Sequence, residues 1–152
     1  MPEKEIRGLF PNIRRTRLDL TSKIDGNYNC AAWAIEDVKR WWEPYGLILP
    51  TSTPEYHWPD ELPHNSKPET YVRFFALNGY ELADDDSLEE GYTKIAIYVL
   101  DDEFAHVARQ VSRYRWTSKI GEQEDIEHSL RALENDAPYT YGTASIFMRK
   151  PK

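Results

Sequence analysis

Apolar and small residues follow a helical pattern directly after a polar turn in the first quarter of the chain. The turn signal is Asp25-Gly26-Asn27-Tyr28. From Cys30 onward, apolar or small residues recur at i, i+4, i+8 and i+11, the spacing of one helical face. They are Cys30, Ala34, Val38 and Trp41. With Asn29 at the N-cap position, the pattern predicts a helix whose first turn contains Cys30.

The segment 44–68 is rich in proline, which fixes the backbone angle φ and removes a hydrogen-bond donor. The prolines are Pro44, Pro50, Pro54, Pro59, Pro63 and Pro68. The sequence therefore predicts a long ordered loop. Loops of this length are uncommon unless they cover or build a site.

The second half of the chain alternates between helical and β-strand patterns. Tyr71, Phe74, Phe75 and Leu77, followed by the stop signal Asn78-Gly79, predict a second helix. Strands are predicted over 94–100, 106–111, 114–119 and 142–148 because these segments are rich in β-branched and aromatic residues. A short helix is predicted between the last two strands, from Ile126, Leu130 and Leu133.

These elements predict an α+β fold, with an N-terminal helical portion packed on a mainly antiparallel sheet of about four strands. The length of 152 residues suits one domain that spans residues 1–152. A formal net charge of -7 and a pI of about 5.1 disfavour nucleic acid and anionic membranes as partners. The chain has no apolar run of the ~20 residues that span a bilayer and no secretion-signal pattern, so we expect a cytoplasmic protein.

Motifs for cofactors and metals are missing from the sequence. His57, His64 and His128 have no metal-ligand spacing, and we interpret them as scattered surface residues. The run 84–86 lacks the ligand alternation of a calcium loop and is interpreted as a solvated turn. No glycine-rich phosphate loop is present, so we expect neither a metal nor a cofactor.

Cys30 is the single cysteine of the chain. A thiol at the first turn of a helix feels the positive end of the helix dipole and nearby free N–H groups, which favour the thiolate. Those N–H groups, with the amide of Asn29 or Asn27, can also hold the oxyanion of an acyl-transfer intermediate. The alternative is a small core residue packed against Ala31 and Ala34.

His106 opens a predicted strand directly after the acidic turn 101–103, where an imidazole can face a helix N-terminus packed on the sheet. The alternative is a structural histidine at a strand edge. Gln110 and Lys119 are further candidates for substrate or oxyanion contacts. The segment 114–121 is interpreted either as a substrate-recognition strand or as a two-faced strand with Trp116 in the core.

A cysteine at the head of a helix, a histidine at the start of a later strand and a polar residue beyond it resemble the papain-like cysteine hydrolases. The resemblance is strongest to their bacterial NlpC/P60 and CHAP-type amidase branches, and segments 29–34 and 106–108 carry it. It implies Cys30 as nucleophile and His106 as general base and acid. It also implies a third residue that orients the imidazole, for which Asp125 is chosen over Ser118 and Glu122.

The leading hypothesis is a cysteine-dependent hydrolase or acyl-transferase that acts on a peptide, amide or ester substrate. Peptidase, amidase and deamidase chemistry all use this nucleophile. The first alternative is a non-enzymatic interaction domain that binds or neutralises a protein partner, which predicts an inert, buried thiol. The second is a catalytically degenerate protein that keeps the papain-like fold without turnover.

Overall fold

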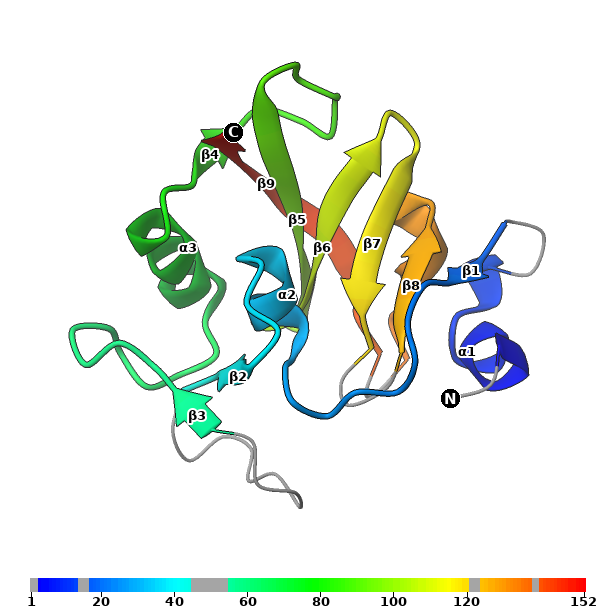
Figure 1. The fold of residues 1–152 in the computed structure, drawn as a ribbon, viewed down its shortest axis with the longest axis horizontal. Coiled ribbons are helices and arrows are strands. Elements are labelled where there is room, and N and C mark those ends of the chain that lie inside the picture. The colour runs from blue at the N-terminus through cyan, green and yellow to red at the C-terminus, as the bar shows by residue number, and fades with distance from the viewer. Residues whose placement is uncertain (1–2, 14–16, 45–54, 121–123, 138–139) are drawn as a thin grey trace.

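The computed structural model describes residues 3–13, 17–44, 55–120, 124–137 and 140–152 (Figure 1). Its centre is a seven-stranded sheet in the order β1-β8-β7-β6-β5-β9-β4, with every neighbouring pair antiparallel. In that order the strands are Asp19–Leu20, Asp125–His128, Arg115–Lys119, Glu103–Ser112, Tyr92–Leu100, Thr143–Pro151 and Glu81–Ala83. β2 (Arg40–Trp42) and β3 (Glu55–His57) form a separate two-stranded parallel sheet.

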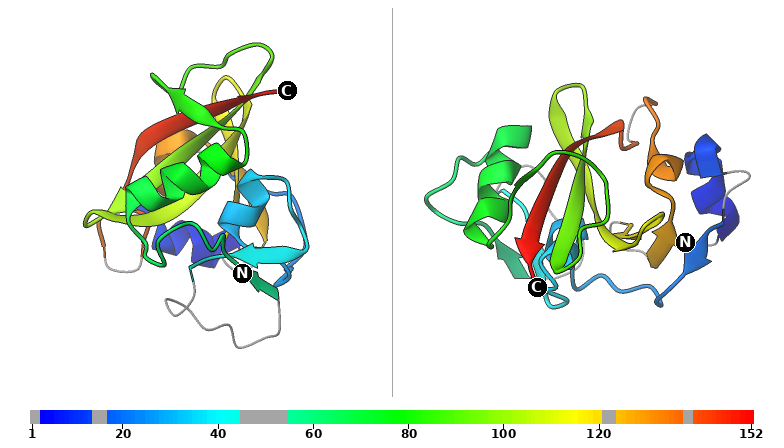
Figure 2. Two further views of the ribbon diagram at one scale, coloured as in Figure 1. Left: turned by 90° about the vertical axis from the view of Figure 1, so that its left-hand side faces the viewer. Right: turned by 90° about the horizontal axis from the view of Figure 1, so that it is seen from above.

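Both faces of the sheet are covered. The α1-side cluster packs under α1 (Glu3–Leu9) and the 3-10 turns η1 (Pro11–Ile13) and η2 (Leu130–Leu133). The α2-side cluster packs under α2 (Cys30–Ala34) and α3 (Pro68–Leu77). Figure 2 shows α1 and α3 on opposite sides of the sheet.

The buried residues of these clusters define the core. The α1-side cluster contains Ile6, Phe10, Ile13, Leu18, Ala96, Tyr98, Ala108, Trp116, Ile120, Ile126, Leu130, Ala132, Leu133 and Ala144. The α2-side cluster contains Ala31, Ala34, Trp58, Leu62, Tyr71, Phe74, Phe75, Tyr80, Ile95, Ile97, Val107 and Met148. Successive residues of β5 alternate between the two clusters, which explains why its central segment is buried without interruption.

The expected architecture of a helical portion on about four strands is wrong. The main sheet has seven strands, and the helices are short, α3 being the longest with 10 residues. The additional strands are β1, β4 and β8, which have only two to four residues each. Segments that short carry too little alternation to be distinguished from loops in the sequence.

Two helix predictions are also wrong in detail. The helix that begins at Cys30 ends at Ala34, because Glu36 adopts a positive φ of 64° that a helix does not continue through. Val38 is exposed, and Trp41 lies in β2. The helix predicted around Ile126 is divided between strand β8 and the 3-10 turn η2.

Other predictions are confirmed. The four predicted strands correspond to β5, β6, β7 and β9, and the second helix corresponds to α3. α3 ends at Asn78, and Gly79 follows with a φ of +93°, as the stop signal predicts. The predicted loop over 44–68 is confirmed only in part: residues 45–54 lie outside the described part of the chain, and Glu55–His57 form strand β3. Beyond β3, Trp58 is buried and its ring N–H donates to the Pro63 carbonyl.

Candidate functional site

The helix that carries Cys30 is capped by Asn29, as predicted. The Asn29 side-chain oxygen accepts the backbone N–H groups of Ala32 at 3.1 Å and Trp42 at 3.2 Å. Its amide nitrogen donates to the Trp42 carbonyl at 3.1 Å and to Oε1 of Glu43 at 3.2 Å. Because both amide hydrogens are used, the Asn29 side chain joins α2 to β2 and has no donor left for an oxyanion.

Cys30 lines a cavity of about 340 Å³, which we call the Cys30 cavity. Its lining residues come from α2, the end of β2, the approach to α3 and the start of β6. They are Asn29, Cys30, Glu43, Ser66, Tyr71, Phe104 and Ala105. The rings of Tyr71 and Phe104 stack with their centroids 3.6 Å apart. A single thiol therefore opens into a space large enough for a small organic group.

The expected activation of the Cys30 thiol is not found. Burial raises the pKa of Cys30 to about 12. The backbone N–H groups of Val107 and Ala31 lower this pKa, and the negative charge of Glu43 raises it further. The helix-entry donors that the sequence predicts are present, but desolvation outweighs them, and the resting group is a thiol.

This pKa predicts slow alkylation of the native protein. At pH 7 to 8, iodoacetamide is expected to modify Cys30 at least about tenfold more slowly than a free cysteine, whose pKa is about 8.5. The rate should still be rising at pH 10, because the thiolate fraction increases with pH up to the pKa. Mass spectrometry of timed samples measures the rate, with the urea-unfolded chain as control. A plateau below pH 8 in the folded protein would contradict the raised pKa.

His106 lies in β6 and is 1% exposed. Its Nε2 is 2.8 Å from Oγ of Ser118 on β7, and the same Oγ is 2.7 Å from Nε2 of His128 on β8. Nδ1 of His128 is 2.8 Å from the carbonyl oxygen of Ser129. Three neighbouring strands thus contribute one continuous hydrogen-bonded chain, the His–Ser–His relay.

The direction of every hydrogen bond in the relay follows from its last member. A carbonyl only accepts, so Nδ1 of His128 carries a proton, and in a neutral ring its Nε2 is then an acceptor. The Ser118 hydroxyl therefore donates to His128 and accepts from Nε2–H of His106. The relay fixes His106 as the Nε2–H tautomer, with an unprotonated Nδ1 that makes no hydrogen bond within the described chain.

Both imidazoles of the relay are neutral at physiological pH. Burial lowers the pKa of His106 well below its usual value, and the nearby His128 adds to the effect. Burial also lowers the pKa of His128 to about 4; the Ser129 carbonyl opposes this shift, and the positive charge of Arg115 reinforces it. The relay therefore keeps the tautomer that the hydrogen bonds specify.

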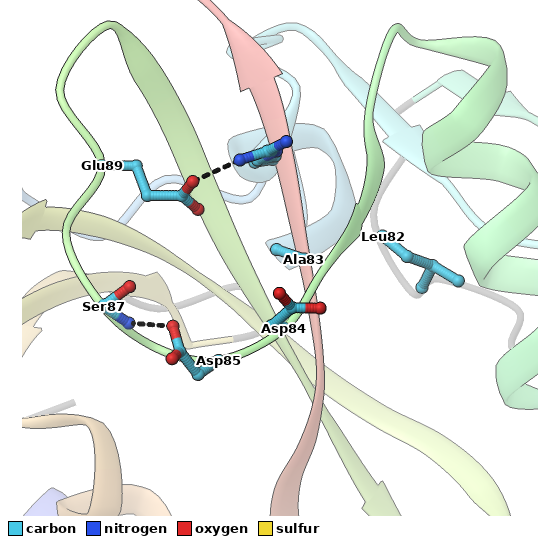
Figure 3. A pocket seen from close by; sticks show the side chains of 7 residues that line it. Leu82, Ala83, Asp84, Asp85, Ser87 and Glu89 are labelled. Carbon is cyan, nitrogen blue, oxygen red and sulfur yellow. Dashed lines mark hydrogen bonds and ion pairs between the residues drawn. The ribbon is translucent and has the colours of Figure 1, made fainter.

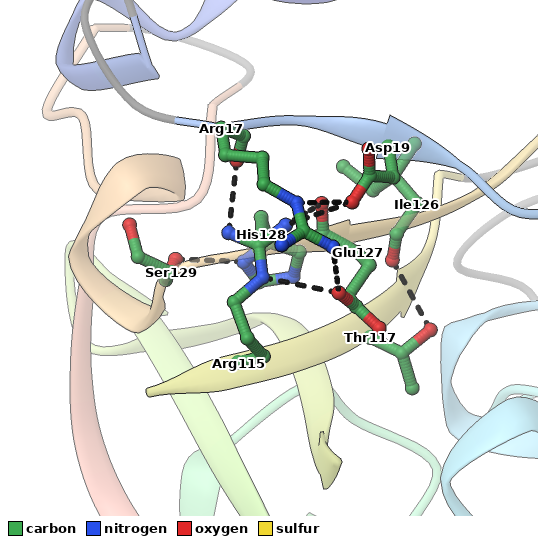
Figure 4. A network of polar contacts seen from close by, with 8 residues as sticks. All are labelled: Arg17, Asp19, Arg115, Thr117, Ile126, Glu127, His128 and Ser129. Carbon is green, nitrogen blue, oxygen red and sulfur yellow. Dashed lines mark hydrogen bonds and ion pairs between the residues drawn. The ribbon is translucent and has the colours of Figure 1, made fainter. Parts of the chain in front are cut away.

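Arg115 is held beside His128 by acidic and carbonyl groups (Figure 4). Its guanidinium donates to the Glu127 carboxylate and backbone carbonyl, both at 3.1 Å, and to the Arg17 carbonyl at 2.9 Å. An ion pair with Asp19 at 3.4 Å adds a contact to β1. This network covers the edge of the sheet next to the relay and fixes a positive charge there.

The Cys30 thiol lies beside the backbone of β6, the strand that carries His106. The thiol faces the backbone N–H of Val107, the residue after His106. β7 pairs with β6 only from Arg109 onward, so no described strand pairs with this part of β6 on the β7 side. Tyr141 stacks on the His106 ring at 4.0 Å, and its pKa is raised by burial and then by the charge of a Cys30 thiolate.

No hydrogen bond joins Cys30 to His106 among the described residues. The Cys30 side chain, from α2, and the His106 side chain, from β6, pack on different sides of the sheet. Cys30 packs against the α2-side cluster together with Val107, whereas His106 contacts Tyr98 and Tyr141 of the α1 side. In the resting structure the two side chains therefore lie on opposite sides of β6, and His106 is not among the described residues that line the Cys30 cavity.

The other predicted site residues have different positions. Asp125 accepts the Tyr28 hydroxyl at 2.7 Å, and no hydrogen bond or ion pair connects it to His106 in the described chain. Gln110 donates to the Asp86 carbonyl at 3.0 Å, near the opposite end of β6. Lys119 lies over the Tyr28 ring at 4.9 Å. Glu122 lies outside the described residues.

Among the three predicted candidates for the orienting residue, Ser118 is the one that hydrogen-bonds to the His106 imidazole. His128, interpreted from the sequence as a surface residue, is in fact fully buried. A period-two pattern was available to place it, because Ile126 and His128 occupy alternate positions of β8 and both are buried. The same residues also fit a helical pattern, through Ile126, Leu130 and Leu133, and that pattern favours a helix over the strand.

A family model described as "Domain of unknown function (DUF7689)" matches residues 19–149. The chain belongs to the DUF7689 family. The matched part of this DUF7689 chain contains Cys30 and the whole relay, whereas α1 and η1 precede it. Comparison with curated proteins and with solved structures finds no match.

Two further tests apply to the described part of the DUF7689 chain. None of its His, Cys, Asp and Glu side chains gather in groups of three or more that could hold a metal ion. None of its helices has the length and apolar character needed to cross a membrane.

A second cavity of about 210 Å³ lies beside the acidic segment 84–86 (Figure 3). The ammonium of buried Lys94 binds the carbonyls of Asp85 and Ser87 at 3.0 and 2.5 Å and the Glu89 carboxylate at 2.7 Å. Arg149 contacts the same carboxylate. The loop is thus held by an internal cation rather than being only a solvated turn.

Proposed function

We propose that the protein is a cysteine-dependent hydrolase or acyl-transferase that acts on an amide or ester through Cys30 and His106. The observation that carries the proposal is the direction of the His–Ser–His relay. It leaves Nδ1 of His106 unprotonated, on the residue directly before the Val107 backbone N–H that the thiol faces. The order of nucleophile and base along the chain, which resembles papain-like hydrolases, supports it.

In the proposed reaction, Nδ1 of His106 accepts the thiol proton as the sulfur of Cys30 attacks the substrate carbonyl carbon. The negative oxygen of the tetrahedral intermediate is placed near backbone N–H groups that face the sulfur, such as those of Val107 and Ala31. The imidazolium then protonates the leaving group, and a thioester on Cys30 remains. Water or an acceptor amine attacks the thioester with His106 again as base, which restores the thiol.

The raised pKa of Cys30 determines when proton transfer occurs. Because the resting pair is a neutral thiol and a neutral imidazole, the proton must move during attack rather than before it. The step also requires Sγ and Nδ1 to come within hydrogen-bond reach when substrate binds. Because the two side chains pack on different sides of β6 at rest, substrate binding must move at least one of them.

The test of the proposal is formation of an acyl-enzyme. The protein is incubated with an activated ester such as p-nitrophenyl acetate, and mass spectrometry locates the added acyl group. We expect one acyl group on Cys30 in the native protein and none in Cys30→Ala. Acylation confined to surface lysines, or equal acylation of the Cys30→Ala variant, would exclude the thiol as nucleophile.

The high pKa of Cys30 also favours a second candidate function, a non-enzymatic interaction domain with an inert thiol. That candidate predicts no acyl-enzyme from any activated ester in the folded state. It also predicts that substitutions in the relay change stability and leave thiol chemistry unaffected. The acylation experiment therefore separates the two candidates directly.

The identity of the orienting residue is a separate prediction. Ser118→Ala removes the acceptor for Nε2–H of His106 and is expected to slow acylation of Cys30 at least about tenfold, since loss of an orienting group costs up to about 10⁴-fold in serine proteases. Asp125→Asn keeps an acceptor oxygen for Tyr28 and is expected to change the rate by less than about twofold. Ser145→Ala, at an exposed position of β9, is the control for Ser118. A larger effect at Asp125 than at Ser118 would reverse the assignment.

A further inference from the structure

We propose that the Cys30 cavity selects substrates that carry a positively charged group, which the Glu43 carboxylate binds. This inference rests on the proposed function, because it names the class of substrate for the same site. The composition of the cavity wall supports it. Among the described lining residues, Glu43 is the only one with a charged side chain.

The Glu43 side chain is fixed next to the nucleophile. Its Oε1 accepts the Asn29 amide at 3.2 Å, and its backbone N–H donates to the His57 carbonyl at 3.2 Å. Asn29 immediately precedes Cys30, and the carboxylate charge is close enough to act on the thiol. Because Glu43 and Cys30 line the same cavity, a group bound at Glu43 would share that space with the sulfur.

The neutral part of the wall also suits a cation. Tyr71 and Phe104 line the cavity as a stacked pair whose facing surfaces cover each other, so an ammonium or guanidinium group would meet an outer ring face. The remaining described lining residues are the small or polar Asn29, Ser66 and Ala105 together with the nucleophile. None of the described lining residues is a lysine or arginine, so this part of the wall has no cation that would bind an anionic substrate.

A cation at this position would also affect the chemistry. The Glu43 charge disfavours the thiolate, and a positive group bound to that carboxylate offsets the charge. Binding of the right substrate would then make proton transfer from Cys30 to His106 easier. The same carboxylate would thus select the substrate and couple its binding to formation of the nucleophile.

Binding is measured with two amides that differ only in charge, N-acetyl-lysinamide and N-acetyl-norleucinamide. The protein is the Cys30→Ala variant, which cannot react, and calorimetry gives both affinities. We expect the lysine amide to bind at least about tenfold more tightly. A second variant carries Cys30→Ala together with Glu43→Gln, which keeps a side-chain oxygen to accept the Asn29 amide. In this variant the two affinities should agree within about twofold. Glu5→Gln, an exposed charge change on α1, should leave the preference intact.

Equal binding of the two amides, no binding of either, or a preference that survives Glu43→Gln would overturn the inference. Methyl esters of the same two N-acetyl amino acids, given to the native protein, test the proposed function separately. If neither ester acylates Cys30 while the amide preference depends on Glu43, the cation site stands and the proposed reaction fails. If both esters acylate Cys30 at equal rates and the amides bind equally, the reaction stands and the cation site fails.

Discussion

His106→Ala is expected to slow acylation of Cys30 by an activated ester by about 10²- to 10⁴-fold, the usual contribution of a general base. The effect should be large because the Cys30 thiol is not ionised at rest. A nucleophile with a pKa of about 12 depends on a base during attack far more than a preformed thiolate does. The acyl-enzyme is followed by mass spectrometry at several times, at pH 7.5.

Two further variants make this result specific. His106→Gln fills most of the space of the imidazole and can donate an amide N–H to Ser118, so it separates loss of the base from loss of packing. It should be as slow as His106→Ala. His64→Ala, at an exposed position, controls for histidine removal and should acylate at the native rate. Native rates in both His106 variants would show that His106 does not act as the base.

Gly142→Ala is expected to destabilise the fold by about 2–5 kcal/mol, the sum of left-handed backbone strain and overpacking. Gly142 has a φ of +70°, and an added Cβ would lie 2.0 Å from the carbonyl oxygen of Val99 in β5. The residue has little freedom to move, because it exchanges two backbone hydrogen bonds with Asn135, at 2.7 and 3.0 Å. Urea unfolding followed by tryptophan fluorescence measures the loss as a lower midpoint.

The matched control is Gly8→Ala. Gly8 lies in α1, and an added Cβ there would have no atom within 4 Å. Alanine in place of glycine within a helix stabilises by about 0.5–1 kcal/mol, so the midpoint should rise slightly.

Gly142→Ala should also slow acylation, because the neighbouring Tyr141 stacks on His106. If the unfolding midpoint of Gly142→Ala equals that of the native protein, Gly142 lies farther from the Val99 backbone than the structure shows.

The elements that could be predicted from the sequence are those whose pattern of apolar residues matches the faces that the fold buries. β5 and α3 have long apolar patterns and clear end signals, and both were found where expected. The helix from Cys30 was predicted too long because Val38 and Trp41 fit a helical face by spacing alone. The positive φ of Glu36, which ends the helix, has no signal in the sequence.

The candidate site was predicted in part. The helix-entry position of Cys30 and its Asn29 cap follow from local rules, and both are confirmed. The thiol pKa depends on burial by distant segments, and the relay depends on the register of β6, β7 and β8. Neither the thiol pKa nor the strand register can be predicted from a short stretch of sequence. The sequence therefore favours Asp125 by its chemistry, whereas in the structure its carboxylate accepts the Tyr28 hydroxyl.

Because the chain has a single cysteine and it lies in α2, the reactivity of the Cys30 thiol measures how often α2 separates from the sheet. α2 is only five residues long, and its thiol faces the backbone of β6. Each time α2 separates from the sheet, Cys30 regains the reactivity of an ordinary thiol, and a disulfide reagent in solution can trap it. When reclosing is faster than trapping, the ratio of native to unfolded rates is the equilibrium constant for that opening. This chain therefore allows the free energy of one helix detaching from its sheet to be measured without any engineered label.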